Sequence, residues 1–484
     1  MGLLSHLRPR VPPTQAEAAQ GMAHQAALST AGILVQGAVR FVYSVLVGNV
    51  LGQYALGSLN AGIALAMLAS LLVPSATAMA ATKYVARYRG ALDLERADGA
   101  AHHLARITLV SMAGLAVGTT VLAVPLLRLD PTEAVLSGAL AAAYSGYVYV
   151  RGFLFGAGQT LRATVWDVVS AALALAGLVL VLAVEASAWL LLPLVLCYGL
   201  YTVVSWPRAS GALPTEVRRE IRGFLWLSLV NAVATGGFLQ LTMVAAQYWD
   251  PGGAGSFAAA LSLATPASLA SRSLTLVLFP SLSAAVGRGD AAGAARQTDL
   301  ATRGLVVLSL ATFGPLMILS PALIDLFYRS EEFEPAKVLL PVLLGAVMLT
   351  NLAAGAINSL LSREHRHSRF VVAASVVGAV VGMGWWVVRA PSGGVLQIAI
   401  GFAIGSAVVG LAPVAAAWVL ESHRWTPAAV RLAAGAAAVT AICWWEQEQG
   451  VGVVGQVVLA TAFTALWLAL SLRDVRLLLG AVRR

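Results

Sequence analysis

Arginines inside apolar segments are the residues of this chain best suited to chemistry. Arg40 and Arg272 each lie near the middle of an apolar run of about 20 residues or more. A charge at the centre of a bilayer costs at least about 2.5–3.5 kcal/mol, so it usually faces a cavity or a partner. The planar guanidinium donates two parallel hydrogen bonds, which suits phosphate and carboxylate oxygens. Two such groups facing a shared water-filled cleft would bind a diphosphate or a carboxylate.

Two other charges in apolar segments have more than one interpretation. Arg151 lies close to one end of its segment, where it could line the same cavity or reach lipid headgroups. Asp167 stands near the start of the next segment beside Arg162, and we interpret it as an interfacial acid at a helix N-terminus. Arg40 itself could instead pair with helix carbonyls or with a buried polar side chain. The polar residues expected to share the cavity are Gln36, Asn60, Asn231 and Gln240.

Two basic clusters border the apolar segments. The run KYVARYRG at 83–90 and the run REHRHSR at 363–369 each hold three Lys or Arg residues. Either cluster could bind headgroups or a lipid-linked anion, or could serve only as a topology signal. Arginines crowd the histidines of the second run and no thiolate is near, so we expect no metal site and no cofactor. The candidate anion contacts are Lys83, Arg87, Arg89, Arg363, Arg366 and Arg369.

The composition is that of a membrane protein. Of the 484 residues, 59% are hydrophobic and only 11% are charged, with a mean hydropathy of +0.82, whereas a soluble protein carries about 25% charged residues. Apolar runs of about 20 residues recur along the chain, while a barrel would show alternating segments of about 10. We predict an all-α polytopic membrane protein. The sequence contains no phosphate-binding loop, nucleophile elbow, zinc pattern or paired carboxylates in a span, so we do not expect an enzyme.

The apolar runs predict 14 membrane spans. With both termini in the cytoplasm, 24 of the 31 Lys and Arg residues fall on the cytoplasmic side and 4 on the outer side. This bias obeys the positive-inside rule and predicts a multi-pass protein of the cell membrane. It also explains the net charge of +9 as a topology signal, so we expect no nucleic-acid partner. The spans lie at roughly 27–50, 57–82, 105–127, 133–156, 163–184, 187–206, 223–248, 254–284, 301–327, 337–361, 370–388, 395–419, 427–445 and 451–472.

Internal similarity indicates a duplication. GSLNA at 57–61 is echoed by GSFAA at 255–259, and Gly152 aligns with Gly355 at a similar offset. Parallel repeats of this kind are related by an axis along the membrane normal, and substrate sites lie at the repeat interface. The sequence predicts a cytoplasmic tail at 1–26, an N-lobe of spans one to six at 27–209, a C-lobe of spans seven to twelve at 210–422, and a final helix pair with a basic tail at 423–484.

Two stretches carry a resemblance to a known family. LGQYALGSLNAGIALAMLASLLVPSATAMAATKYVARYRG at 51–90 and RGFLFGAGQTLRATVWDVVSAALALAG at 151–177 are similar to the polysaccharide or O-antigen (Wzx-type) flippases. That family lies in the multidrug/oligosaccharidyl-lipid/polysaccharide exporter (MOP) superfamily and is related to the lipid II flippases. The resemblance implies two six-helix lobes in a V, alternating access and a polyprenyl-diphosphate-linked glycan as cargo. It also implies cavity arginines on spans one and eight, which hold Arg40 and Arg272, and a lipid-tail groove on the last two spans.

We therefore expect a flippase that moves a cell-surface polysaccharide precursor from the inner to the outer leaflet. Outward movement of an anion is downhill by about 2.3 kcal/mol per charge per 100 mV across an inside-negative membrane. A lipid II flippase is the nearest alternative. A multidrug/cation antiporter is disfavoured by the cationic cavity and by a first span without a carboxylate.

Other classes remain open. A membrane-embedded glycan polymerase or ligase would need a large outer loop, and the predicted outer loops are short. A scaffold without transport activity is a further alternative. The expected partners are an anionic lipid-linked glycan, membrane lipids and glycan assembly enzymes, with the chain itself a monomer.

Overall fold

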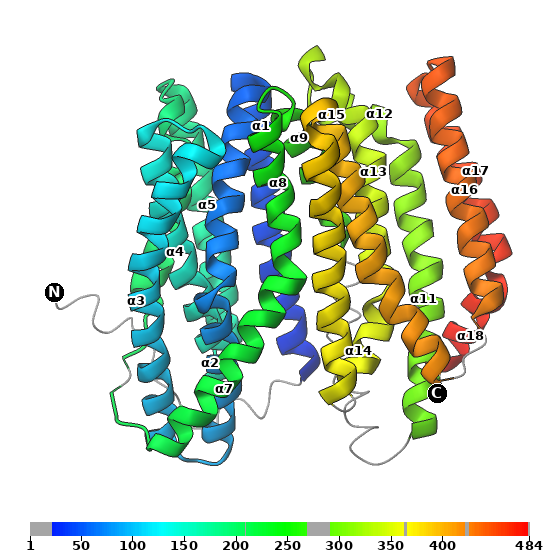
Figure 1. Ribbon diagram of the computed structural model, residues 1–484. Coiled ribbons are helices and arrows are strands. Elements are labelled where there is room, and N and C mark those ends of the chain that lie inside the picture. The colour runs from blue at the N-terminus through cyan, green and yellow to red at the C-terminus, as the bar shows by residue number, and fades with distance from the viewer. Residues whose placement is uncertain (1–21, 209, 269–290, 363–364, 422–424, 483–484) are drawn as a thin grey trace. The chain divides into compact units, whose positions relative to one another are not determined.

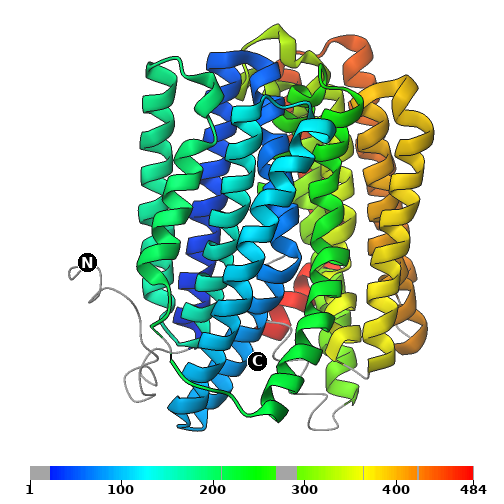
Figure 2. The same cartoon turned by 60° about the vertical axis from the view of Figure 1, so that its left-hand side comes forward.

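The computed structural model describes residues 22–208, 210–268, 291–362, 365–421 and 425–482. The structure is 91% helical, and no strand occurs among the described residues. Contacts divide the chain into two compact units, Met1–Ala254 and Gly255–Arg484. Within each unit most helices run lengthwise beside one another (Figures 1 and 2). The predicted all-α architecture is confirmed.

The first unit begins with a helix that folds back on itself. Helix α1 reverses at Gly52, whose φ of 81° and ψ of −176° fall in a region that is open essentially only to glycine. Its two legs run side by side, since Arg40 of the first contacts Met67 of the second. The reversal falls in the turn predicted between spans one and two. The elements are α1 (Met22–Leu71), α2 (Val73–Gly90), α3 (Leu94–Leu127), α4 (Pro131–Gly156), α5 (Thr160–Ala183), η3 (Ser187–Trp189), α6 (Leu192–Ser205), α7 (Thr215–Ala232), η4 (Val233–Gly237) and α8 (Phe238–Trp249).

Helices α2 and α4 meet at two glycines. A Cβ on Gly152 would lie 2.6 Å from the carbonyl oxygen of Ala78, and one on Gly156 would lie 2.6 Å from that of Ala81. Small residues four positions apart let membrane helices touch through their backbones. Thr82 Oγ1 closes the contact by donating to the carbonyl of Gly152 over 2.9 Å. We call this contact the α2–α4 seam, and no larger residue fits at either glycine without displacing the helices.

A second close approach joins two helix irregularities. Leu72 interrupts the path from α1 to α2 just before Pro74, which lacks a backbone donor. Gly236 lies in the π-helical turn between α7 and α8. A Cβ on Gly236 would lie 3.2 Å from Cδ1 of Leu71, so the π turn packs directly beside the break.

The second unit contains another doubled helix. Helix α15 reverses at Gly394, with φ 55° and ψ −149°, in the turn predicted between spans eleven and twelve. Trp386 Nε1 joins the two legs by donating to the carbonyl of Ile398 over 2.9 Å. Trp467 Nε1 donates to the carbonyl of Val307 over 2.9 Å and so joins α17 to α11. The described elements are α9 (Ala254–Ala264), η5 (Pro266–Ser268), α11 (Ala291–Ile318), α12 (Ser320–Phe327), η6 (Glu331–Phe333), α13 (Glu334–Leu352), α14 (Ala354–Ser362), α15 (His365–Glu421), α16 (Thr426–Gln449), α17 (Val453–Leu470) and α18 (Leu472–Val482).

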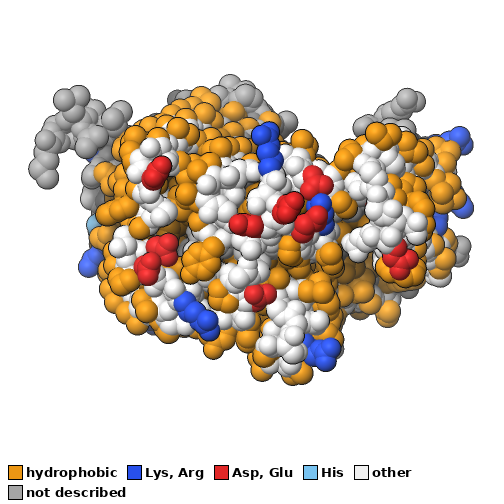
Figure 3. Space-filling model, turned by 90° about the horizontal axis from the view of Figure 1, so that it is seen from above, with side chains coloured by type: hydrophobic (Ala, Val, Ile, Leu, Met, Phe, Trp, Pro, Cys, Tyr) orange, Lys and Arg blue, Asp and Glu red, His pale blue; other side chains and the backbone are white. Residues whose placement is uncertain are grey.

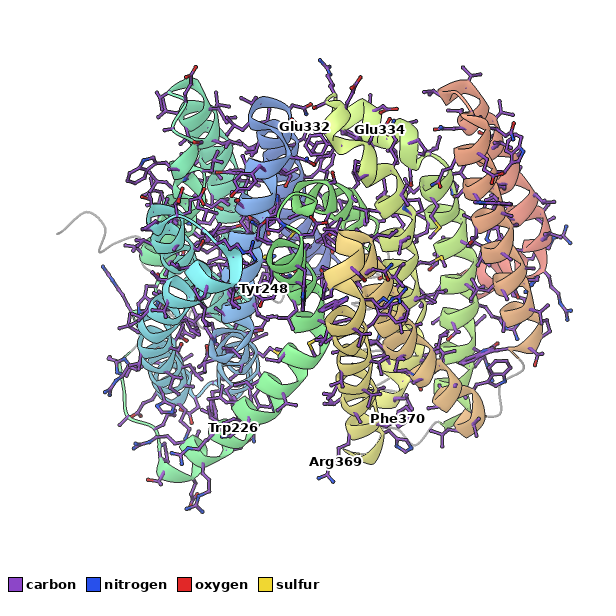
Figure 4. All side chains as sticks on the ribbon, turned by 45° about the horizontal axis from the view of Figure 1, so that its top comes forward. Trp226, Tyr248, Glu332, Glu334, Arg369 and Phe370 are labelled. Atoms are coloured by element: carbon purple, nitrogen blue, oxygen red, sulfur yellow. The ribbon has the colours of Figure 1, made fainter. Side chains whose placement is uncertain are left out.

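The helices fit a multi-pass membrane protein. Nine helical stretches among the described residues are long and apolar enough to cross a bilayer, and two of them, Ala27–Leu71 and Arg369–Leu420, fold back at a glycine. Together with the shorter apolar helices, they are compatible with about 14 spans. Figure 3 shows acidic side chains on the surfaces that are seen from above, and Figure 4 labels Glu332 and Glu334 of the second unit beside the start of α13. The membrane side that each end faces stays a prediction.

The compact units divide later in the chain than the predicted lobes. Helix α7 packs on α2 and α8 packs on α1, so both helices belong to the first unit. The predicted boundary between 209 and 210 rests on the sequence repeat and stays a prediction about that repeat. The predicted V of two lobes likewise stays a prediction.

Candidate functional site

Arg40 lies in the first leg of α1 and is half-buried. Its Nη1 donates to the sulfur of Met67 over 3.0 Å, and its Cζ stands 5.2 Å from the ring centroid of Tyr144 on α4. Tyr198 of α6 also interacts electrostatically with the guanidinium. Aromatic rings stabilise a cation by only about 0.5–2 kcal/mol. No carboxylate of the described residues pairs with Arg40, so its charge is uncompensated there.

Gln36, one helical turn before Arg40, joins α1 to two other helices. Its Nε2 donates to the carbonyl of Asp167 over 2.9 Å and to Ser170 Oγ over 3.2 Å. Its Oε1 accepts a hydrogen bond from the Tyr198 hydroxyl over 3.0 Å. A partly buried amide whose hydrogen bonds are all satisfied fixes the rotation of one helix against its neighbours. Gln36 therefore orients the helix that carries Arg40 and does not pair with that arginine.

Arg151 and Asp167 form an ion pair inside the first unit. Arg151 Nε lies 3.0 Å from Asp167 Oδ2, and the Tyr147 hydroxyl donates to Asp167 Oδ1 over 3.0 Å. The Asp167 side chain is 0% exposed and that of Arg151 is 18% exposed. Gly32 of α1 leaves room for the pair, because a Cβ there would collide with the carboxylate. The predicted position of Asp167 at a helix N-terminus is wrong: α5 begins at Thr160, about two turns before Asp167. The depth of Asp167 in the membrane stays a prediction.

Four tyrosines connect the surroundings of the two arginines. Tyr144 and Tyr147 come from α4, and Tyr198 and Tyr201 come from α6, with ring centroids 4.8–5.5 Å apart. Within each helix the two tyrosines are three residues apart, so their rings share one face. We call Arg40, Gln36, the four tyrosines, Arg151 and Asp167 the N-unit polar network. The tyrosine spacing was the sequence signal that could have revealed it.

The other predicted cavity residues lie apart from this network or outside the described structure. Asn60 Nδ2 donates to the carbonyl of Leu56 over 3.0 Å and contacts Ser44 Oγ at 3.4 Å. Gln240 is half-buried on α8. The side chain of Asn231 and the whole of Arg272 lie outside the described residues. The second predicted guanidinium of the cavity therefore stays a prediction.

The basic run at the end of α2 packs against the start of α7. Lys83 Nζ lies 4.1 Å from the ring centroid of Phe224, and Arg87 Nη1 lies 3.0 Å from Glu220 Oε1. The Tyr84 hydroxyl donates to the same carboxylate over 3.3 Å. Burial, with Glu220 adding to it, raises the pKa of Tyr84 to about 12. Two of the predicted anion contacts are thus in contact with another helix.

The remaining predicted anion contacts differ in exposure, and some of them lie outside the described residues. Arg89 is half-buried at the end of α2. Arg369 is exposed near the start of α15, beside Phe370 in Figure 4. Arg363 and the side chain of Arg366 lie outside the described residues. Among the residues that the structure describes, no group of three His, Cys, Asp or Glu side chains could hold a metal ion.

Solved structures with the same architecture identify the fold. The chain matches an inward-facing multidrug resistance MATE transporter of the MOP superfamily with a TM-score of 0.65 and 16% identity, over 81% of this chain and 94% of that one. It matches the lipid II flippase MurJ, in an inward closed conformation, with a TM-score of 0.70 and 12% identity, over 93% of this chain and 99% of that one. The fold is that of the MOP superfamily.

A third structure with the MOP fold differs in the polarity of its binding pocket. It is a MOP superfamily transporter from Pyrococcus furiosus, described as having a reversed pocket polarity that suggests a different function. The chain matches it with a TM-score of 0.54 and 14% identity, over 87% of this chain and 98% of that one. These three structures are described as two transporters and a flippase. No family model and no curated protein matches the sequence.

Proposed function

We propose that this chain is an alternating-access flippase that moves a polyprenyl-diphosphate-linked oligosaccharide from the inner to the outer leaflet. The MOP fold supports transport, because the compared structures with this fold are described as transporters and a flippase. The resemblance of residues 51–90 and 151–177 to Wzx-type flippases supports a glycan lipid as cargo. The product would be a precursor of a cell-surface polysaccharide.

The guanidinium of Arg40, which pairs with no carboxylate in the part of the chain that the structure describes, is the observation that carries this proposal. A cation in a membrane helix usually faces a cavity or a partner. Arg40 has a thioether and two tyrosines around it, and none of these groups carries a counter-charge. A diphosphate would supply that charge, and its oxygens fit the planar fork of the guanidinium. Arg272, on predicted span eight, is proposed as the second guanidinium.

Lipid II is the second candidate cargo. The match to MurJ covers 93% of this chain and 99% of MurJ, more of both chains than the match to the inward-facing MATE transporter. A second lipid-linked diphosphate would suit Arg40 equally well. A cationic drug is disfavoured, because Arg40 would repel it and the nearby carboxylate of Asp167 is already paired with Arg151.

Complementation separates the two cargoes. The chain is expressed in two bacterial strains, one depleted of its lipid II flippase and the other lacking an O-antigen flippase. Rescue of only the second strain supports the proposed function, and rescue of the first assigns the chain to peptidoglycan synthesis. Rescue of neither strain, with the protein present in the membrane, counts against both cargoes.

A direct assay complements the genetic one. Purified protein in liposomes is given a fluorescent polyprenyl-diphosphate sugar, and flipping is measured as the fraction that becomes accessible to a membrane-impermeant quencher. We expect faster flipping than in protein-free liposomes, and faster again with a membrane potential that drives anions toward the quencher. A rate equal to that of protein-free liposomes would contradict the proposal.

A further inference from the structure

The last described helix begins where a lipid-facing surface ends. Helix α17 is apolar enough to cross a bilayer, and Ser471 alone separates it from α18. On α17 the side chains of Leu466, Leu468 and Leu470 are exposed. Exposed leucines on a membrane helix face lipid tails, which are as apolar as leucine itself. The first turn of α18 therefore lies next to the boundary between lipid and water.

An ion network fixes the rotation of α18. The Asp474 side chain is 3% exposed and accepts hydrogen bonds from Arg303 of α11, over 3.3 Å, and from Arg431 of α16. Arg303 also pairs with Asp299 at 3.0 Å, and Trp425 Nε1 donates to Asp299 over 2.7 Å. The face of α18 that carries Asp474 is thereby held against α11 and α16.

The opposite face of α18 is basic and apolar at once. Leu472, Arg473, Arg476 and Leu477 are all exposed. At about 100° per residue, these four side chains share an arc of about 140°. Arg473 and Arg476 take no part in the ion network of Asp474. Helices of this kind lie in the bilayer interface, with leucines at the acyl boundary and guanidiniums at the phosphates.

We propose that Leu472, Arg473, Arg476 and Leu477 form a binding face for the headgroups of anionic bilayer phospholipids. The leucines continue the exposed apolar surface of α17, and the arginines supply charge where the headgroups lie. Each arginine near a surface favours an anionic lipid by about fivefold. This face is distinct from the N-unit polar network and does not depend on the identity of the cargo.

The test uses the full chain in lipid bilayers. Cys197 and Cys443 are replaced by alanine, and the Leu470→Cys variant, at the exposed end of α17 next to this face, is labelled with a fluorophore. Vesicles of phosphatidylcholine and phosphatidylglycerol carry a spin-label quencher on either one lipid or the other. We expect about fivefold or stronger quenching by labelled phosphatidylglycerol relative to phosphatidylcholine. In about 1 M salt, where the Debye length falls to about 3 Å, most of this preference should vanish.

Substitutions identify the groups responsible. In the labelled background, the Arg473→Gln/Arg476→Gln variant should make the two quenchers equally effective. The matched control Arg106→Gln/Arg219→Gln removes two exposed cations of the first unit and should keep the preference. Equal quenching in the unsubstituted labelled chain, or quenching by neither lipid, would overturn the proposal. The salt measurement uses the labelled chain that retains both arginines, so it tests the proposal even if the double variant fails to fold.

Discussion

Arg40 and Arg151 lie in one unit, but only Arg151 has a carboxylate partner among the described residues. Arg151 is paired with a fully buried carboxylate that also accepts a tyrosine hydrogen bond. Arg40, among the described residues, contacts a thioether and aromatic rings without a carboxylate. Removing one partner of a buried ion pair leaves a charge that the surroundings cannot stabilise. We infer that Arg151 serves structure, whereas Arg40 is available to a ligand.

This difference shows that the depth of a charge in a membrane segment does not by itself assign its role. Both arginines lie in apolar segments of the sequence, and both border the same tyrosine cluster. What separates them is Asp167, which the packing of α5 on α4 brings to only one of them. Substitutions at the two arginines should therefore have different effects on transport and on stability.

Replacing Arg40 should have the largest effect on transport. Arg40→Gln should reduce flipping by about 30-fold or more, because loss of one partner of a desolvated charge pair costs about 2–5 kcal/mol. Folding should be retained, since no buried carboxylate loses its partner. The liposome assay measures the rate, and thermal unfolding in detergent serves as the control. Unchanged flipping in a well-folded variant would remove the basis of the proposed function.

Replacing Arg151 should instead affect stability. Arg151→Gln leaves Asp167 as a buried unpaired charge, and we expect a loss of about 3–5 kcal/mol in the free energy of unfolding. The double variant Arg151→Gln/Asp167→Asn removes both charges and should recover most of that loss. Unfolding in denaturant measures both variants. A single variant as stable as the unsubstituted chain would show that the ion pair is not structural.

Removing the hydrogen bonds of Gln36 should have an intermediate effect on the flipping rate. Gln36→Leu removes the hydrogen bonds to Asp167, Ser170 and Tyr198, and each such bond in a membrane contributes about 0.6 kcal/mol on average. We expect a severalfold slower flipping rate with little change in expression. The matched Asn60→Leu variant removes an amide from the same doubled helix outside the network, and its flipping rate should stay closer to normal. Equal slowing in the two variants would argue against an orienting role of Gln36.

The α2–α7 ion pair should matter least to stability. Arg87→Gln and Glu220→Gln each remove one partner of the same partly exposed ion pair. Such pairs contribute about 0–1 kcal/mol to the free energy of unfolding. If Arg87 also contacts an anionic headgroup, Arg87→Gln alone should slow flipping. Similar slowing by Glu220→Gln would assign the effect to the ion pair and not to the headgroup.

Sequence periodicity predicts the helices better than it predicts their partners. The reversals at Gly52 and Gly394 fall in turns that follow directly from the ends of apolar runs. The pairing of Arg151 with Asp167 does not follow, because it depends on how α4 and α5 rotate about their axes. Gln36 was predicted as a polar cavity residue, yet its contacts with α5 and α6 emerge only from the packed structure. Arg272 lies outside the described residues, so its predicted role is untouched by the structure.

The α2–α4 seam should make helices α2 and α4 move together as one rigid body. Backbone meets backbone at Gly152 and Gly156, so no side-chain rotamer can absorb a displacement of one helix relative to the other. A shift of the basic end of α2 is therefore passed to α4, which carries Tyr144 and Tyr147. The basic end of α2 and the surroundings of Arg40 are thus joined mechanically, without a relay of side chains between them.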